Sequence, residues 1–461
     1  MKLNKKKNMK TLNFYSKSIV ILLFTGLFMN TVAAQTEKKE QVTKVYEMTP
    51  TGSLQFTSGS GSNVEILTWD RNEVKIVGEL TYGDIDNKED IDKILNAFKS
   101  MDAQSSKDVL KLNLKLIESS MFKSGGLFKK GESLIVLSNG DKITTFSSFG
   151  VQNKIETTYT IWIPATLSVK AECKFGKLKI APIEGNVDLI LNHNNLEMRD
   201  FGKSGIFEIR FSKVSIGSGG TSKINLYHSE VNTVELKNVT IDARFSKFNI
   251  AKAEDVSLIS YHDNSAIFGM LDNIDASAKF STIHIENNMG NAKFDFYHSK
   301  LFGENFQTLE ISAKFSEFNV ANISDTKITS SYHNKFNFVT VNTFSCQESK
   351  FDTFKFDEVI ANASFPNAYQ TKVDIRGTSA SFSSFSGNFR FGTVNLKLNP
   401  TVVYNLNFDG TFGKLDGVSP DKFKTKFVSD KNNTKTTVQG LNAGAKCNIE
   451  LVVQNTTCKI E

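Results

Sequence analysis

The chain has 461 residues, a formal net charge of +6 and four cysteines. Residues 1–34 contain six lysines and no acidic residue, so the remainder of the chain carries 6 − 6 = 0. A neutral surface lacks the net basic charge on which non-specific nucleic-acid binding depends, and this argues against a nucleic-acid partner. The cysteines show no C-x-x-C spacing, so redox catalysis and a zinc ribbon are poorly supported.

Residues 1–34 have the pattern of a signal peptide. Lysines near the start precede an apolar run at residues 19–29, and the small residues at 32–34 are typical of a cleavage site. The run is short for a membrane-spanning helix, and no cysteine follows it to carry a lipid. We therefore predict an exported mature chain without a transmembrane segment, located in the periplasm, at the outer membrane or on the cell surface.

Residues 35–165 predict a separate β-rich region with one helix. Short alternating segments between residues 53 and 79 are divided by turn residues, as strands are. Residues 86–101 predict a helix capped by Asp86, because apolar residues recur at helical spacing between Ile91 and Phe98. The Gly- and Lys-rich residues 119–132 predict a loop. Residues 155–164 predict a strand that ends at Pro164.

Phe and His then alternate at a step of 17 or 18 residues. The ladder consists of Phe175, His193, Phe211, His228, Phe245, His262, Phe280, His298, Phe315, His333 and Phe351. So regular a step predicts stacked structural repeats. In each repeat, apolar residues alternate with polar ones up to the ladder residue. The alternation then skips one position and resumes, as a corner between two strands requires. Residues 166–420 therefore predict a parallel β-solenoid with coils of about 17–18 residues, in an all-β protein.

A coil of about 35 residues is the alternative, with Phe and His on different faces of one turn. The shared frame of Ile224-Asn-Leu226-Tyr-His228 and Ala276-Ser-Ala278-Lys-Phe280 argues against it. Beyond Phe351 the step drifts, and Phe365, Phe382 and Phe412 are the expected successors. Residues 421–461 predict C-terminal cap strands that cover the edge of the solenoid. Cys447 and Cys458 flank an apolar run and would suit a hairpin disulfide, whereas Cys173 and Cys346 lie ten coils apart.

Three repeat units carry a family resemblance. Residues 174–180 (KFGKLKI), 244–250 (RFSKFNI) and 314–320 (KFSEFNV) resemble repeats of the domain family named "putative adhesin", exported β-solenoid proteins of Bacteroidota with unknown function. The opening segment 61–74 (GSNVEILTWDRNEV) also resembles that family, and the likeness covers most of residues 44–420. The resemblance implies an adhesin-like role and supplies no catalytic residues. The regular His in alternate coils departs from the family pattern.

The ladder histidines would be about 10 Å apart in alternate coils, too far to share a metal ion. The simplest interpretation is that they pack inside between Phe rings, where burial would disfavour the protonated form. Acidic pH would then loosen the stack. His284 lies between two isoleucines and is expected to point outward as ordinary surface.

The column beside the ladder points outward and alternates basic residues with tyrosines. We call it the basic–tyrosine stripe: Lys174, Arg210, Tyr227, Arg244, Tyr261, Lys279, Tyr297, Lys314, Tyr332 and Lys350. Its simplest role is to stabilise itself through cation–π contacts between neighbouring coils. Its functional interpretation is a linear groove for a polymer, in which Tyr faces contact sugars and Lys or Arg binds carboxylates or sulfates.

An enzyme is the less favoured interpretation. Glu208, Asp242, Asp275 and Asp295 look like scattered surface charges, and no catalytic, cofactor or metal motif is present. We therefore predict a non-catalytic adhesin-like or cell-envelope scaffold without a cofactor, whose partner is an envelope or surface ligand, with a glycan as the candidate. The alternative is a carbohydrate-binding or polysaccharide-processing solenoid.

Overall fold

The computed structural model describes residues 37–461 except 84, 86, 123–131, 147–154 and 433. The predicted signal peptide lies outside the described residues. The chain divides into two compact units, one made of residues 1–42, 78–100 and 116–157, the other of 43–77, 101–115 and 158–461. Within the part of the chain that the structure describes, no helix has the length and apolar character needed to cross a membrane.

The first unit contains the predicted helix. Helix α2 (Lys88–Lys99) is capped by Asn87, whose side chain accepts the Glu89 N–H at 3.0 Å. The helix thus begins two residues later than expected, and the expected cap, Asp86, lies outside the described residues. Strands β7 (Ile117–Phe122), β8 (Glu132–Leu137) and β9 (Lys142–Phe146) form an antiparallel sheet. Residues 119–122 of the expected loop therefore belong to β7, and Glu132 begins β8. The residues between them lie outside the described residues.

The remaining strands before residue 166 are short. They are β1 (Lys38–Glu47), β2 (Ser53–Ser58), β3 (Ser62–Trp69), β4 (Glu73–Tyr82), β5 (Ala103–Ser105), β6 (Val109–Asn113) and β10 (Ile155–Pro164). Strands β2 and β3 pair in parallel with β11 and β12, and β6 pairs in parallel with β2. The parallel ladder of the second unit thus takes in strands that precede residue 166.

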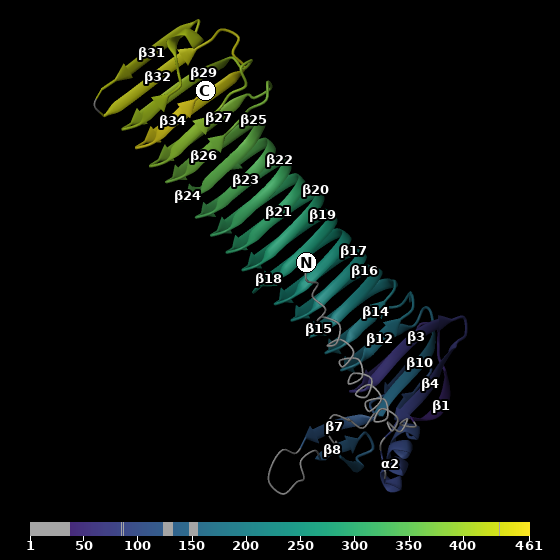
Figure 1. Ribbon diagram of the computed structural model, residues 1–461. Helices are drawn as coiled ribbons and strands as arrows, with labels where there is room; N and C mark the ends of the chain where they lie inside the picture. Colours follow the sequence, from purple (N-terminus) through teal and green to yellow (C-terminus); the bar gives the residue numbers. More distant parts are fainter. Residues whose placement is uncertain (1–36, 84, 86, 123–131, 147–154, 433) are drawn as a thin grey trace, which may run out of the picture. The chain divides into compact units, whose positions relative to one another are not determined.

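From residue 168 the chain is a parallel β-solenoid. Its strands are β11 (Ser168–Lys174), β12 (Lys177–Ile180), β13 (Val187–Asn192), β14 (Asn195–Met198), β15 (Phe201–Arg210), β16 (Lys213–Tyr227), β17 (Glu230–Arg244), β18 (Lys247–Tyr261), β19 (Ser265–Lys279), β20 (Thr282–Tyr297), β21 (Lys300–Lys314), β22 (Glu317–Tyr332), β23 (Lys335–Cys346), β24 (Ser349–Lys350), β25 (Thr353–Tyr369), β26 (Lys372–Ile375), β27 (Ser384–Arg390), β28 (Thr393–Leu396), β29 (Tyr404–Thr411) and β30 (Lys414–Asp416). Figure 1 shows these coils side by side in one stack.

One coil corresponds to one step of 17 or 18 residues. Lys174 lies opposite Asn192, and Asn192 lies opposite Arg210. Arg244 lies in the same way opposite Tyr261. The 35-residue alternative is therefore wrong, and the predicted fold class is confirmed.

Each coil buries alternate residues and turns where the alternation skips. In β17, Val231, Ile241 and Ala243 are buried, and the chain turns sharply after Arg244. The return segment is also paired, because Leu236 lies opposite Ala253 and is buried with it. The coil is thus hydrogen-bonded around most of its circumference, which fixes the outward columns in register.

The C-terminal coil is inserted out of sequence order. Strands β33 (Cys447–Gln454) and β34 (Thr457–Ile460) pair on one side with β27 and β28 and on the other with β29 and β30. Strand β32 (Lys435–Leu441) then covers β29 in antiparallel pairing, and β31 (Lys426–Lys431) covers β32. Figure 1 shows β31 and β32 beyond β29 at the yellow end. The last coil in the sequence is therefore not the last coil in space.

All four cysteines are buried and free. Cys447 and Cys458 lie on β33 and β34, which are separated by a corner at Asn455 with φ 46°. The two strands belong to one coil rather than to a hairpin, so the expected hairpin disulfide is absent.

Candidate binding surface

The Phe/His ladder lies on the outside of the solenoid, and its predicted inward packing is wrong. Every ladder residue has a left-handed backbone, with φ between 46° at His228 and 63° at His262. The side chains are exposed, to 55% at Phe175 and 39% at Phe245. A single left-handed residue shifts the alternation by one position, so the ladder residue points outward and the next residue takes the inward place. The burial that was expected to disfavour histidine protonation is absent.

A column of small polar residues occupies the inward place beside the ladder, and sequence analysis missed it. Its members are Asn194, Ser212, Ser229, Ser246, Asn264, Ser281, Ser299, Ser316, Asn334, Asp352 and Thr371. Ser246 is typical: its Oγ accepts the Ser229 N–H at 3.1 Å and donates to the Arg244 carbonyl at 2.8 Å. The signal was available, because a Ser or Asn follows most ladder residues within two positions.

The ladder rings form one continuous stack. Successive Phe and His rings from Phe175 to Phe351 have centroids 4.7–6.4 Å apart and interplanar angles of 4–11°. Each ring covers the face of the next, so only ring edges face the solvent. A ligand therefore cannot stack on the faces of these rings.

Beyond Phe351 the left-handed corner continues at only one of the three expected residues. It is occupied by Gln370, Phe391, Asn455 and Phe412, with φ between 46° and 58°. Phe412 was expected, whereas Phe365 and Phe382 are buried core residues and those two predictions are wrong. The spacing drifted there because β25 carries a register shift and the last coil is inserted from the C-terminus.

The basic–tyrosine stripe lies in register directly beside the ladder, on neighbouring coils from Lys174 to Lys350. Tyr227 and Tyr297 remain 38% and 37% exposed. Their rings stand nearly perpendicular to the ladder rings, as in the Tyr227–Phe245 pair at 6.1 Å and 90°. The ring planes of Tyr227, Tyr297 and Tyr332 therefore run along the stack, whereas Tyr261 contacts the Lys279 ammonium.

The expected cation–π pairing is found at one position among the described residues, where the Lys279 Nζ lies 5.1 Å from the Tyr261 ring. Three other stripe bases are ion-paired along their own strand, whereas Arg210 has no carboxylate at ion-pair distance among the described residues. Lys174 contacts Glu172 at 2.8 Å, Arg244 contacts Asp242 at 3.7 Å and Lys350 contacts Glu348 at 2.6 Å. These carboxylates neutralise part of the stripe.

The centre of the stripe is different. Within the described part of the chain, Lys279 and Lys314 have no carboxylate at ion-pair distance. A serine stands two residues before each of them (Ser277 and Ser312), where the paired bases have an acidic residue. These two lysines flank Tyr297, one coil away on each side. The segment from Tyr261 to Tyr332 thus combines free positive charge with half-exposed aromatic surface.

A hollow of about 490 Å³ lies over the first half of the stripe. Arg210, Tyr227 and Arg244 line it together with Glu208 and Asp242. These two carboxylates were expected to be scattered, but they lie in one column, two coils apart, with Asn225 between them. At twice the strand spacing their backbones are about 10 Å apart.

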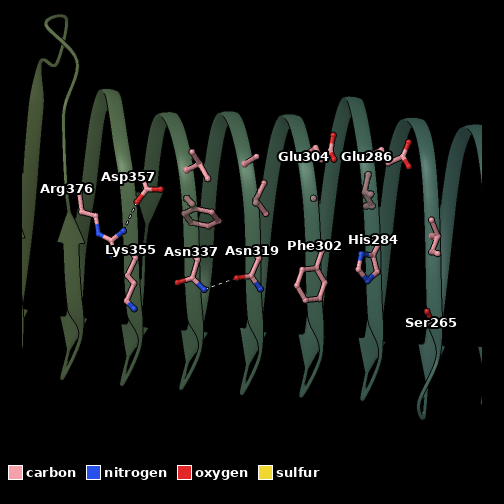
Figure 2. A pocket seen from close by; sticks show the side chains of 17 residues that line it. Ser265, His284, Glu286, Phe302, Glu304, Asn319, Asn337, Lys355, Asp357 and Arg376 are labelled. Atoms are coloured by element: carbon pink, nitrogen blue, oxygen red, sulfur yellow. Dashed lines mark hydrogen bonds and ion pairs between the residues drawn. The ribbon is translucent and has the colours of Figure 1, made fainter.

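A larger hollow of about 750 Å³ lies on the face that follows the corner (Figure 2). His284 points outward there, as expected, and its ring stacks on Phe302 at 4.7 Å. Figure 2 shows that other side chains of this hollow bind one another: Asn337 donates to Asn319 at 2.9 Å, and Arg376 contacts Asp357 at 2.9 Å. These four side chains are paired within the protein. We favour the stripe as the binding surface because its basic and tyrosine residues form one continuous column.

Comparison with known proteins adds little. No protein-family model and no curated protein matches the chain, so membership in the adhesin family stays a prediction. A crystal structure described as a "putative cell adhesion protein" from Clostridium sporogenes aligns over 92% of this chain and 99% of its own, at 10% identity and a TM-score of 0.15. So poor a superposition carries no argument about function. Among the described residues no group of three His, Cys, Asp or Glu side chains could hold a metal ion.

Proposed function

We propose that this protein is an exported, non-catalytic, adhesin-like scaffold of the cell envelope whose ligand surface is the basic–tyrosine stripe. The observation that carries the proposal is the half-exposed Tyr297 between Lys279 and Lys314, two lysines that have no carboxylate at ion-pair distance among the described residues. A lysine that no carboxylate neutralises can bind an anionic group of a ligand, and Lys279 is held in place by its contact with the Tyr261 ring.

The ligand that fits this surface is a linear glycan. The in-register ladder holds the stripe residues at a fixed spacing of about 4.8 Å per coil, so little ordering is required on binding. Tyrosine ring planes run along the stack and offer apolar faces to sugar rings of a chain that lies in the same direction. The lysines would bind carboxylates or sulfates of that chain.

The stripe could instead serve only to stabilise the stack. Tyr227, Tyr297 and Tyr332 each contact ladder rings edge to face, and such contacts contribute to stability without any ligand. If the stripe binds a ligand, removal of tyrosines from a stack that remains folded weakens ligand binding. If the stripe only stabilises the stack, ligand binding is unchanged.

Replacing Tyr261 and Tyr297 by Ala tests the proposal. Loss of two aromatic contacts of about 0.5–1.5 kcal/mol each would weaken glycan binding roughly fivefold to 150-fold. Phe302→Ala, on the other face, is the matched control and should bind as the unaltered protein does. Binding to a glycan panel that is unchanged in the double variant, with intact circular dichroism, would reject the stripe as the ligand surface.

The hollow around Glu208 and Asp242 favours a second candidate, a polysaccharide-processing solenoid. Carboxylates on opposite sides of a sugar chain are what glycoside hydrolysis requires. Incubation of the purified protein with anionic polysaccharides, followed by measurement of reducing ends and unsaturated products, separates the candidates. Product release that is lost in Glu208→Gln would establish catalysis and overturn the non-catalytic proposal.

The proposed location is tested on intact cells. A surface protein is cleaved by added protease, whereas a periplasmic protein is cleaved only after the outer membrane is permeabilised. Surface cleavage favours an external ligand, and protection favours a role inside the envelope.

A further inference from the structure

Between Arg210 and Phe351 the coils of the solenoid are of two alternating kinds. In one kind a basic stripe residue is followed by a ladder Phe, as in Lys279-Phe280 and Lys314-Phe315. In the other a stripe Tyr is followed by a ladder His, as in Tyr297-His298. Permanent positive charge therefore recurs on every second coil, about 10 Å apart, and every intervening coil carries an imidazole.

The ladder imidazoles are accessible and have no charged partner. All five are exposed, and no carboxylate lies within ion-pair distance of them in the described part of the chain. Histidine is the side chain whose charge ordinarily changes between pH 5 and 8. Protonation would place a cation on the coils that lack one, one residue away from the basic column.

The charged groups around these histidines leave the added charge largely uncompensated. Near His298 they are Asp295 and Tyr297 on β20, Lys279 on β19, Lys300 and Lys314 on β21, and Glu317 on β22, whose carboxylate contacts Lys300 at 3.7 Å. Near His262 they are Asp263, Tyr261 and Lys247 on β18, Arg244 on β17 and Lys279 on β19. Basic groups outnumber acidic ones at both positions.

We propose that the ladder histidines make the basic–tyrosine stripe a pH-dependent surface for linear polyanions, such as a polyuronate or a sulfated glycan. This inference rests on the proposed function. A bound polyanion favours the protonated form of the histidines between the basic coils, so acidification should add cations to the surface that the ligand contacts. Each added exposed ion pair strengthens binding by about 1.4-fold to fivefold, so three histidines along one ligand chain should strengthen it by about threefold to 100-fold.

The test compares binding at pH 5.5 and 7.5. The probes are fluorescent polygalacturonate and dextran sulfate, with neutral dextran as the uncharged control. Dextran sulfate remains fully ionised at both pH values, so any change reports on the protein. The test variant is His262→Gln, His298→Gln and His333→Gln together in the mature chain, which should remain folded because Gln370 occupies the same left-handed corner with φ 47°. His284→Gln is the control, since it removes an exposed imidazole from the other face.

We expect both polyanions to bind at least about threefold more tightly at pH 5.5, the pH effect to shrink in the triple variant, which keeps His193 and His228, and the full effect to persist in His284→Gln. A pH effect of unchanged size in the triple variant overturns the inference, and so does the absence of any effect in the unaltered protein.

Failure of the inference and failure of the proposed function can be told apart. Binding that is independent of pH but lost in Lys279→Met with Lys314→Met rejects the histidine role and keeps the stripe as the ligand surface. Lys355→Met, on the other face, controls for the loss of a positive charge. Polyanion binding that is unaffected by the stripe lysines, the stripe tyrosines and the ladder histidines would reject both proposals.

Discussion

The buried polar column provides a direct test of what holds one coil on the next. The Ser246 Oγ is the acceptor for the backbone N–H of Ser229, and both residues are buried, at 1% and 6% exposure. In Ser246→Ala this N–H loses its acceptor inside the stack. The Arg244 carbonyl keeps the His228 N–H at 3.1 Å, so a single group is left unsatisfied.

A buried donor without a partner costs about 1–3 kcal/mol, and we expect Ser246→Ala to lower the free energy of unfolding by that amount. Two matched variants isolate the effect. Ser257→Ala removes an exposed hydroxyl from the neighbouring strand and should change stability by less than about 0.5 kcal/mol. Ser246→Asn should restore stability, because Asn264 and Asn334 accept the equivalent N–H at 2.7 Å each.

Urea unfolding followed by circular dichroism gives the change in stability. Hydrogen exchange of the peptide around Ser229 shows whether the loss is local, as expected for a stack in which each coil contacts only its neighbours. Equal stability of Ser246→Ala and Ser257→Ala would refute the reasoning, since it would mean that the buried hydroxyl does not bind its neighbouring coil.

Three further predictions concern charge, thiols and topology. Burial raises the pKa of Asp352, so its contribution to stability falls as pH rises above the ordinary value of 3.8. Asp352→Asn should therefore flatten the stability curve above about pH 4, and an unchanged curve would contradict this. Burial also raises the pKa of the cysteine thiols, to about 11 at Cys173 and Cys447 and about 12 at Cys458. A thiol-reactive dye should label almost none in the native protein and four after unfolding without reductant, whereas only two would reveal a disulfide. Leu451→Ala, in the inserted coil, should cost about 2–5 kcal/mol and increase hydrogen exchange in residues 404–416. Val452→Ala, 55% exposed on the same strand, should have little effect, and equal effects of the two would argue against the insertion.

Much of the candidate surface was predictable from the sequence. The stripe residues were placed in one outward column, and the structure brings them into register from Lys174 to Lys350. The ion pairs of the stripe bases were less predictable. The ion pairs that neutralise Lys174 and Arg244 involve residues two positions earlier on the same strand, and the distances depend on side-chain conformation. Whether a base of the stripe is ion-paired was therefore decided in three dimensions.

The orientation of the ladder was not predictable from hydrophobicity. Phe is usually a core residue and Ser a surface residue. At the corner after β17, however, Phe245 is exposed and Ser246 is buried. The left-handed corner is favourable only when neighbouring coils supply rings to stack on Phe245 and an N–H for Ser246 to accept. Both partners belong to other coils and are 17 or 18 residues away.

The sequence by itself determined the length of the coil, the register and the identity of the outward stripe, because a repeat of constant step must place equivalent residues above one another. Only the tertiary structure decided which neighbour at each corner turns inward, and that the final coil lies between β27 and β29. The reason is physical: alternation in a strand records only which residues share a face. One left-handed residue reverses the two faces, and the order of coils depends on which sheet edge is open when the last strand docks.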